Sequence, residues 1–291
     1  MPGIKAIDHL ALPVNDIQKA EHFYVDLLGM ELEMRRFNPN GKPRQTYVNN
    51  GSQIGLFLPG TPAPATTTGA PRLGILYPDR RVLEAVLEQL KQEAILFEGP
   101  VGDSCIPGIE CAVLLDDPAG NHLDLCVLKE TIPDTGISHL ILETARPETA
   151  REFYLHAISL EEALQREGEI CFAFESGQFI VLKSVPQLSQ RTRLAGRGVH
   201  FALEVTHQSF EETVKLIEQY GGAVEGDPRA ADGLRPADEK STYFSDPDGN
   251  PFQMSAFSAT RTGSLCDEDR WKRIQENRAQ QGRKLARWEI E

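Results

Sequence analysis

The chain has 291 residues, 40% hydrophobic and 25% charged, as in ordinary globular proteins. Its formal net charge of −13 argues against broad nucleic-acid binding, which needs a cationic surface to displace counterions. No apolar run approaches the roughly 20 residues of a membrane span, and the start lacks a signal-peptide profile. Five scattered cysteines without a Cys-x-x-Cys pair favour a reducing compartment. We therefore expect a cytoplasmic protein without a nucleic-acid or membrane partner.

A short apolar phrase recurs at four places along the chain. Three copies contain a histidine, in the sequences IDHLAL, ISHLIL and GVHFAL around His9, His139 and His200, and a degenerate copy lies at 73–76. The turn Asp-Pro-x-Gly-Asn closes the second and fourth copies, at 117–121 and 246–250. Self-similarity of this kind indicates a repeat architecture. The expected units lie near 6–58, 72–128, 137–184 and 199–257.

In chain order, each unit begins with a strand and continues into a helix. In the first unit the apolar residues from Ile17 to Leu28 follow helical spacing, Asp16 can cap the helix, and Gly29 ends it. Similar helices are expected after Pro147 in the third unit and after Ser209 in the fourth. Alternating segments such as 171–174 and 179–182 then predict strands.

The expected unit is therefore βαβββ, and the fold class is α+β. One half-curled sheet leaves a face bare, so pairs of units should close around a shared concave surface. This predicts two domains of two units each, at 1–130 and 136–258. The charged tail, 259–291, is expected to form a helix that packs on the body or on a second subunit, which leaves a homo-oligomer open.

The histidine-containing starts, the Phe-Tyr pairs at 23–24 and 153–154 and the Asp-Pro-Asp-Gly-Asn turn together resemble the vicinal oxygen chelate superfamily. That superfamily includes glyoxalase I, extradiol dioxygenases, fosfomycin resistance proteins and bleomycin-binding proteins. The resemblance covers roughly residues 5–257, and the four-unit layout is most similar to two-domain extradiol dioxygenases. It implies a glyoxalase/extradiol-dioxygenase-like fold with a small-molecule substrate. Because one fold serves many functions, the site residues must decide the reaction.

The resemblance implies a metal in the C-terminal domain, held by His139, His200 and the residue at 253. Two imidazoles and one oxygen ligand suit non-haem iron(II), so Fe²⁺ is the expected cofactor. The position normally occupied by glutamate is Gln253, a neutral and poorer ligand that some glyoxalase-like members use. Another divalent metal, such as Mn²⁺, Ni²⁺ or Zn²⁺, or no metal, is the alternative.

Tyr243 stands three residues before the last Asp-Pro-x-Gly turn, where the resemblance implies a tyrosine that hydrogen-bonds the substrate. The acid-base histidine of extradiol enzymes has no counterpart. In the N-terminal domain, His9 and Asp124 hold the first and last ligand positions, but the start at 73–75 offers no ligand. That domain is expected to be structural or to shape the substrate site. A site made by His9, His122 and Asp124 is the alternative.

Three functions follow from these residues. The first is a metal-dependent extradiol-type dioxygenase, an oxidoreductase acting on an oxygen-chelating small molecule at His139, His200 and Gln253, with Tyr243 as a catalytic residue. The second is a glyoxalase-like isomerase or lyase that uses a divalent metal as a Lewis acid. The third is a metal-free small-molecule-binding protein of the antibiotic-resistance type.

Overall fold

The computed structural model describes residues 4–37, 40–58, 70–102, 106–129, 136–188, 200–225 and 240–256. The tail 259–291, with its expected helix, lies outside these residues. The described elements divide into the four expected units. The first contains β1 (Ile4–Pro13), α1 (Ile17–Glu21), η1 (His22–Leu27), β2 (Glu31–Phe37), β3 (Pro43–Asn49) and β4 (Gln53–Phe57). The second contains β5 (Arg72–Leu76), α2 (Arg80–Gln92), β6 (Phe97–Val101), β7 (Ile109–Asp116) and β8 (His122–Leu128).

The third and fourth units repeat this order of elements. The third contains β9 (Gly136–Thr144), α3 (Pro147–Glu152), η2 (Phe153–Ala157), β10 (Glu161–Arg166), β11 (Glu169–Ala173) and β12 (Phe179–Ser184). The fourth contains β13 (His200–Val205), α4 (Phe210–Gln219), β14 (Ala223–Glu225), β15 (Lys240–Ser245) and β16 (Pro251–Ala256). The predicted α+β fold of four βαβββ units is confirmed.

The helices of the first and third units widen from α into π geometry at their Phe-Tyr pairs. Asp16 caps α1 by accepting hydrogen bonds from Gln18 N and Lys19 N, as expected. The π turn η1 then buries both Phe23 and Tyr24, which are adjacent in sequence. An α-helix spreads two adjacent side chains by about 100°, so the wider turn helps both rings to face the core.

The strands form two eight-stranded sheets that join units from opposite halves of the chain. Sheet A has the order β14-β15-β16-β13-β1-β4-β3-β2, and sheet B the order β10-β11-β12-β9-β5-β8-β7-β6. Antiparallel pairing of β1 with β13 joins units one and four, and pairing of β5 with β9 joins units two and three. The sequence led us to expect each shared surface within one half of the chain. The continuous sheets instead cross the halves, because the first strand of each unit leaves an edge that needs a partner.

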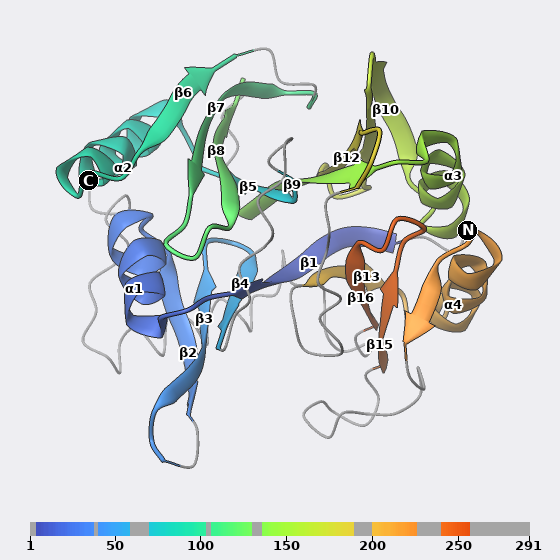
Figure 1. The fold of residues 1–291 in the computed structure, drawn as a ribbon, viewed down its shortest axis with the longest axis horizontal. Coiled ribbons are helices and arrows are strands. Elements are labelled where there is room, and N and C mark those ends of the chain that lie inside the picture. Colours follow the sequence, from blue (N-terminus) through green and yellow to red (C-terminus); the bar gives the residue numbers. More distant parts are fainter. Residues whose placement is uncertain are drawn as a thin grey trace.

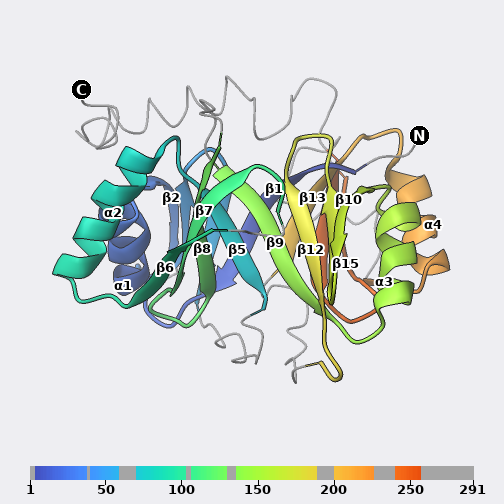
Figure 2. The ribbon, with the colours of Figure 1, turned by 90° about the horizontal axis from the view of Figure 1, so that it is seen from above.

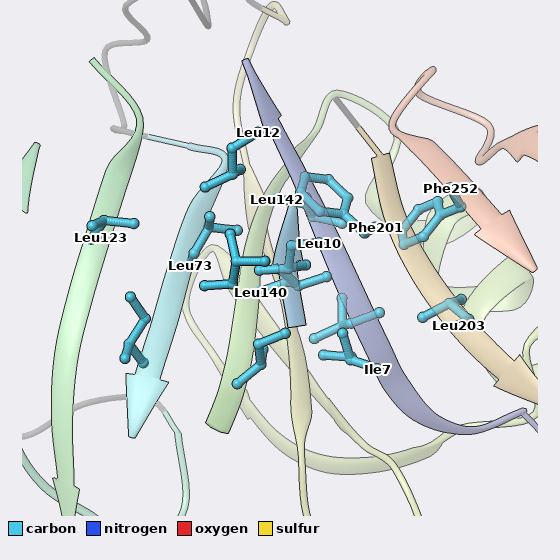
Figure 3. Packing of buried hydrophobic residues seen from close by; sticks show 14 of the residues in the cluster. Ile7, Leu10, Leu12, Leu73, Leu123, Leu140, Leu142, Phe201, Leu203 and Phe252 are labelled. Carbon is cyan, nitrogen blue, oxygen red and sulfur yellow. The ribbon is translucent and has the colours of Figure 1, made fainter. Parts of the chain in front are cut away.

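The core lies between the two sheets, with the helices at both ends (Figures 1 and 2). Figure 3 shows leucines of β1, β5 and β9 packing beside Phe201 of β13 and Phe252 of β16. Two polar residues tie the sheets together beside this core. Gln178 binds the backbone of Ile7 in sheet A and of Ile137 in sheet B, and Ile137 N donates to Ser52 Oγ. Each sheet therefore has a core face and an outer face.

The two Asp-Pro-x-Gly-Asn turns clamp the helix of the preceding unit. Asp117 accepts from the backbone and side chain of Asn121 and from the Tyr24 hydroxyl at 2.9 Å. Asp246 accepts the same bonds from Asn250 and from Tyr154, again at 2.9 Å. The turns thus fasten unit one to unit two and unit three to unit four. None of the helices in the described ranges is long and apolar enough to span a membrane.

Candidate functional site

The outer face of sheet A carries a row of polar side chains that crosses six strands. The strand registers pair Asn49 with Gln53, Gln53 with His9, His9 with Ala202, Ala202 with Gln253, and Gln253 with Tyr243. Paired residues point to the same side of a sheet, and their sequence neighbours Leu10, Phe201 and Phe252 point into the core. His200 lies two residues before Ala202 on β13 and therefore points to the same face. We call this set, with His200 included, the central row.

His9 is held by a buried carboxylate. Its Nδ1 lies 2.5 Å from Asp8 Oδ2, and Asp8 is only 4% exposed. A shift in register between Ile7 and His9 breaks the alternation of β1 at Asp8, which allows both side chains to reach this face. When Nδ1 carries the proton shared with Asp8, Nε2 keeps its lone pair. A carboxylate behind an imidazole is how proteins orient a metal-binding or basic histidine.

His200 lies between His9 and Tyr243. Its ring centroid is 5.6 Å from that of His9 and 5.2 Å from that of Tyr243, with both pairs edge to face. The antiparallel pairing of β1 with β13 places His200 opposite Ala11, two residues along from His9. The small side chain of Ala11 leaves the two imidazoles as neighbours. The structure therefore brings two histidines and one tyrosine together from three strands.

Gln253 carries a bare acceptor in this row. The residue is 1% exposed, and its Nε2 donates to Ser241 Oγ at 2.7 Å. Its Oε1 is buried and receives no hydrogen bond within the described part of the chain. A buried carbonyl oxygen without a donor costs about 1–3 kcal/mol, so it points to a ligand that completes it.

Gln53 and Glu33 complete the row on the other side of His9. Gln53 Nε2 donates to Glu33 Oε2 at 2.9 Å, and Asn49 Nδ2 donates to the same oxygen at 3.4 Å. Both amides thereby hold one carboxylate near the β2 side of the row. Within the described ranges, no group of three His, Cys, Asp or Glu residues could hold a metal by itself. A metal on this face would therefore need amide oxygen as well as imidazole.

Sheet B shows what occupies the equivalent positions in the other pair of units. In sheet B, His139 pairs with Phe179 on one side and with Gly74 on the other. His9 in sheet A has the same two relations, to Gln53 and to Ala202. Gly74 then pairs with Asp124, just as Ala202 pairs with Gln253. Arg72 lies opposite Ile141 on β9, just as His200 lies opposite Ala11 on β1. His139, Arg72 and Asp124 thus correspond to His9, His200 and Gln253.

These sheet B residues satisfy one another. Arg72 Nε donates to Asp124 Oδ1 at 2.6 Å, and His139 Nε2 lies 3.2 Å from Asp124 Oδ2. Burial raises the pKa of Asp124, but His139 and Arg72 outweigh it and lower that pKa below its usual value. Gly74 makes room for the imidazole, since a Cβ at this position would lie 2.1 Å from His139 Nδ1. In sheet B the positive charge beside the carboxylate of Asp124 is therefore supplied by a side chain, the guanidinium of Arg72.

The middle of the outer face of sheet B is largely apolar and buried around this network. Residues from β5, β7, β8, β9, β11 and β12 form one cluster with two residues that precede β5 and β7: Ala70, Leu76, Ile106, Ile109, Ala112, Cys126, Ile141, Cys171 and Val181. Because Arg72, Asp124 and His139 satisfy one another and this cluster surrounds them, the middle of this face is packed like a second core.

The structure therefore brings three of the four expected site residues together and separates the fourth. His200, Gln253 and Tyr243 lie on sheet A, and His139 lies on sheet B. His9 stands where His139 was expected, because unit one and not unit three borders unit four. The sequence showed that His9 occupies the same position of the repeat as His139 and His200, but it did not show which units pair. His9 and Asp124 likewise lie on different sheets.

Matches to family models agree with the fold and the repeat. Residues 6–125 match the Glyoxalase/Bleomycin resistance protein/Dioxygenase superfamily, and residues 139–255 match a Glyoxalase-like domain. The chain belongs to this superfamily, the vicinal oxygen chelate superfamily, and carries its domain twice.

Two solved structures share the arrangement over most of their length. One is a "putative dioxygenase" from Bacillus subtilis, with TM-score 0.69 and 18% identity over 98% of each chain. Another is glyoxalase I from Zea mays, with TM-score 0.64 and 16% identity over 87% of this chain and 92% of that one. Likeness at these identities establishes the fold alone.

Proposed function

We propose that the central row of sheet A binds a divalent metal through His9, His200 and Gln253 and acts as a Lewis-acid enzyme on a small molecule that chelates this metal through two oxygens. The observation that carries the proposal is the buried, bare Oε1 of Gln253. Its counterpart in sheet B, Asp124, accepts a hydrogen bond from the guanidinium of Arg72. In sheet A the position equivalent to Arg72 is occupied by His200 and not by an arginine. A metal ion would supply the missing positive charge.

The donor set fits a borderline metal better than a hard one. Imidazole nitrogen suits zinc, nickel, cobalt and iron, whereas carboxylate-rich sites suit magnesium and calcium. The bound metal would polarise the oxygens of the substrate that it coordinates. Asp8 would fix the tautomer of His9 and direct Nε2 toward the site. All three donors are neutral, so the substrate would have to supply negative charge as an enolate or a similar oxyanion.

Two further residues have roles in this proposal. Glu33, held by Gln53 and Asn49, would accept a proton from a substrate that lies along the row. The hydroxyl of Tyr243, whose ring packs against His200, would hydrogen-bond a substrate oxygen at the other end. These roles suit an isomerase or lyase that moves a proton next to a polarised carbonyl.

A ring-cleaving extradiol-type dioxygenase that uses Fe²⁺ is the second candidate. The contact of Tyr243 with His200 and its pairing with Gln253 favour it, because the resemblance implies such a tyrosine. The missing carboxylate ligand weighs against it, since iron(II) oxygenases use two histidines and one carboxylate. Oxygen uptake with Fe²⁺ and catechols would support this candidate. Turnover without oxygen in the presence of Ni²⁺, Zn²⁺ or Co²⁺ would support the first.

The test of the site is metal content after equilibration with Mn²⁺, Ni²⁺ or Zn²⁺ and removal of free metal. We expect near-stoichiometric binding by the unmodified chain and its loss in His9→Ala and in His200→Ala. His156→Ala, which removes an exposed histidine from η2, is the matched control and should bind normally. No metal in the unmodified chain would overturn the proposal and favour a metal-free binding role. Loss in His139→Ala, with retention in His9→Ala, would move the site to sheet B.

A further inference from the structure

We propose that Arg36 recognises a carboxylate on the substrate and thereby selects anionic chelating molecules. This inference rests on the proposed function of the central row and names the class of its substrate. It assigns the binding role to a residue of the edge strand β2, outside the central row.

The strand registers place Arg36 on the same face as the central row. Arg36 pairs with Gln45, and Gln45 pairs with Phe57. One row closer to His9, Tyr47 pairs with Gly55, Gly55 with Ala11, and Ala11 with His200. Tyr47 and His200 therefore lie in one line across the sheet, three strands or about 14 Å apart at ~4.8 Å per strand. A small molecule bound near the histidines can extend along this line toward Arg36.

The guanidinium of Arg36 is held over this line by an aromatic ring. Its Cζ lies 5.4 Å from the centroid of Tyr47, a cation–π contact that restrains a long side chain. Arg36 is half-buried, and no carboxylate among the described residues forms an ion pair with it. Its neighbour Arg35, on the opposite face, is bound by both carboxylate oxygens of Glu21. In a chain of net charge −13, a half-buried arginine without an acid partner in the described part of the chain is available for an anionic ligand.

A bare acceptor lies beside this arginine. Gln45 stands opposite Arg36 on β3, and its buried Oε1 receives no hydrogen bond within the described ranges. A ligand with a forked anion for Arg36 and a nearby hydroxyl or amide for Gln45 would satisfy both groups. Carboxylates match the planar fork of arginine in this way.

The surface between Arg36 and the histidines suits a flat apolar body. The rings of Tyr47 and Phe57 are 5.9 Å apart and meet over Gly55. A Cβ at Gly55 would lie 2.4 Å from Phe57 Cε2 and 3.3 Å from Tyr47 Cε1, so only glycine permits these ring positions. The next residue along the line is Ala11. The inferred substrate has chelating oxygens at one end, a planar apolar middle and a carboxylate at the other end.

The experiment compares caffeate with its uncharged methyl ester as probes, because both carry the same two vicinal oxygens. Affinities are measured without oxygen on Mn²⁺-loaded protein and on metal-free protein, for the unmodified chain, Arg36→Gln and Arg35→Gln. We expect the unmodified chain to prefer caffeate by about tenfold or more, as a charge-assisted hydrogen bond allows. Arg36→Gln should abolish the preference, and Arg35→Gln, with the ion pair on the other face, should keep it.

Several outcomes overturn the inference and leave the metal site standing. These are equal affinity for caffeate and its ester, a preference that survives in Arg36→Gln, or binding of Mn²⁺ without binding of either probe. Failure of the proposed function gives a different result, because Mn²⁺ then does not bind. The metal-free protein can still prefer caffeate to its ester, and loss of that preference in Arg36→Gln would support the role of Arg36 alone. Equal loss of both probes in Arg36→Gln, with unchanged thermal unfolding, would assign Arg36 a general packing role and also contradict the inference.

Discussion

Gln253 and Asp124 occupy equivalent positions in the two sheets, and their difference in charge matches their surroundings. Asp124 is ionised beside Arg72 and His139, and these partners lower its pKa. Gln253 is neutral and lies beside His9 and His200 without a protein cation in the position of Arg72. A negative charge at 253 would be buried in the metal-free protein without a cationic side chain among the described residues in the position of Arg72. In the metal-free protein a neutral amide at 253 therefore costs less free energy than a buried carboxylate would, although both are completed by a metal.

This comparison predicts that Gln253→Glu tightens metal binding and lowers the stability of the metal-free protein. The added carboxylate gives the metal a charged ligand, so we expect the Kd for Mn²⁺ to fall by at least about tenfold. Without metal the buried charge should reduce the free energy of unfolding by about 1–3 kcal/mol. Titration calorimetry and urea unfolding with and without Mn²⁺ measure both effects.

Gln165→Glu on the exposed strand β10 is the matched control, because it adds the same charge far from the central row. It should change neither the Kd nor the unfolding free energy by much. Equal Kd values for Gln253→Glu and the unmodified chain would argue that residue 253 does not contact the metal.

Asp246 is a buried carboxylate that the repeat uses for structure. Burial raises its pKa from 3.8 to about 6, although hydrogen bonds from Asn250 and Tyr154 oppose the shift. The folded protein therefore holds this proton more tightly than the unfolded chain does. The contribution of Asp246 to stability is fully present below the unfolded pKa near 3.8, and it is lost as the pH rises through about 6.

Asp246→Asn should remove this pH dependence. The free energy of unfolding of the unmodified chain, minus that of the variant, should fall by roughly 2 kcal/mol between pH 4 and pH 7. Chemical unfolding at several pH values measures this difference, and other titrating groups cancel because both proteins contain them. A difference that stays constant with pH would show that the hydrogen bonds offset the burial of Asp246.

At the scale of elements, the sequence predicted the units and their helices well because both depend on local patterns. Apolar spacing predicted the helix from Ile17 to Leu28, and Asp16 does cap it. The π turns at the Phe-Tyr pairs were not predicted, since their cause is the burial of both rings in a core built by distant strands. The role of Asp117 and Asp246 as acceptors for those tyrosines was likewise hidden, although both motifs were recognised.

Gly74 gives a test of how sheet B is filled. The sequence showed only that this first strand lacks a ligand, whereas the structure shows that glycine admits His139. In Gly74→Ala the new Cβ would lie within 2.4 Å of both His139 and Ser138 Oγ, so the imidazole must leave Asp124. We expect a loss of about 1–3 kcal/mol in the free energy of unfolding, as overpacking of a core usually costs. Urea unfolding measures it.

Gly102→Ala is the matched control, because nothing lies within 4 Å of a Cβ at that residue. Metal binding on sheet A should survive in Gly74→Ala if the two outer faces are independent. Equal stability of the two alanine variants would mean that sheet B adapts and that the ion network around Asp124 is not rigid.

At the scale of the whole molecule, the pairing of units decided the candidate site and could not be taken from the sequence. The repeats made units one and three equivalent, and units two and four equivalent, but a repeat does not specify which edges meet. The turns fasten one to two and three to four, whereas the sheets join one to four and two to three. The sequence-based ligand set combined His139 with His200 because it considered only the first relation.

The same double pairing predicts how one half of the chain behaves alone. Residues 1–130 contain β1 and β5 but lack their partners β13 and β9. Because units one and three are equivalent, β1 of one copy can take the place of β9 and pair with β5 of a second copy. His9 would then lie opposite Gly74, as His139 does in the full chain. We therefore expect this fragment to form a symmetric dimer that buries both free edges.

Sedimentation equilibrium of the fragment tests this, with the full chain measured beside it. Concentration-dependent dissociation coupled to unfolding is the expected behaviour, because a lone fragment would expose two strand edges and the apolar side chains of Leu10, Leu12 and Leu73 around them. A monomeric fragment with a cooperative unfolding transition would instead show that the face-to-face contact of units one and two is sufficient for folding. In that case the sheets would join halves that are already folded, and the central row would form only when they meet.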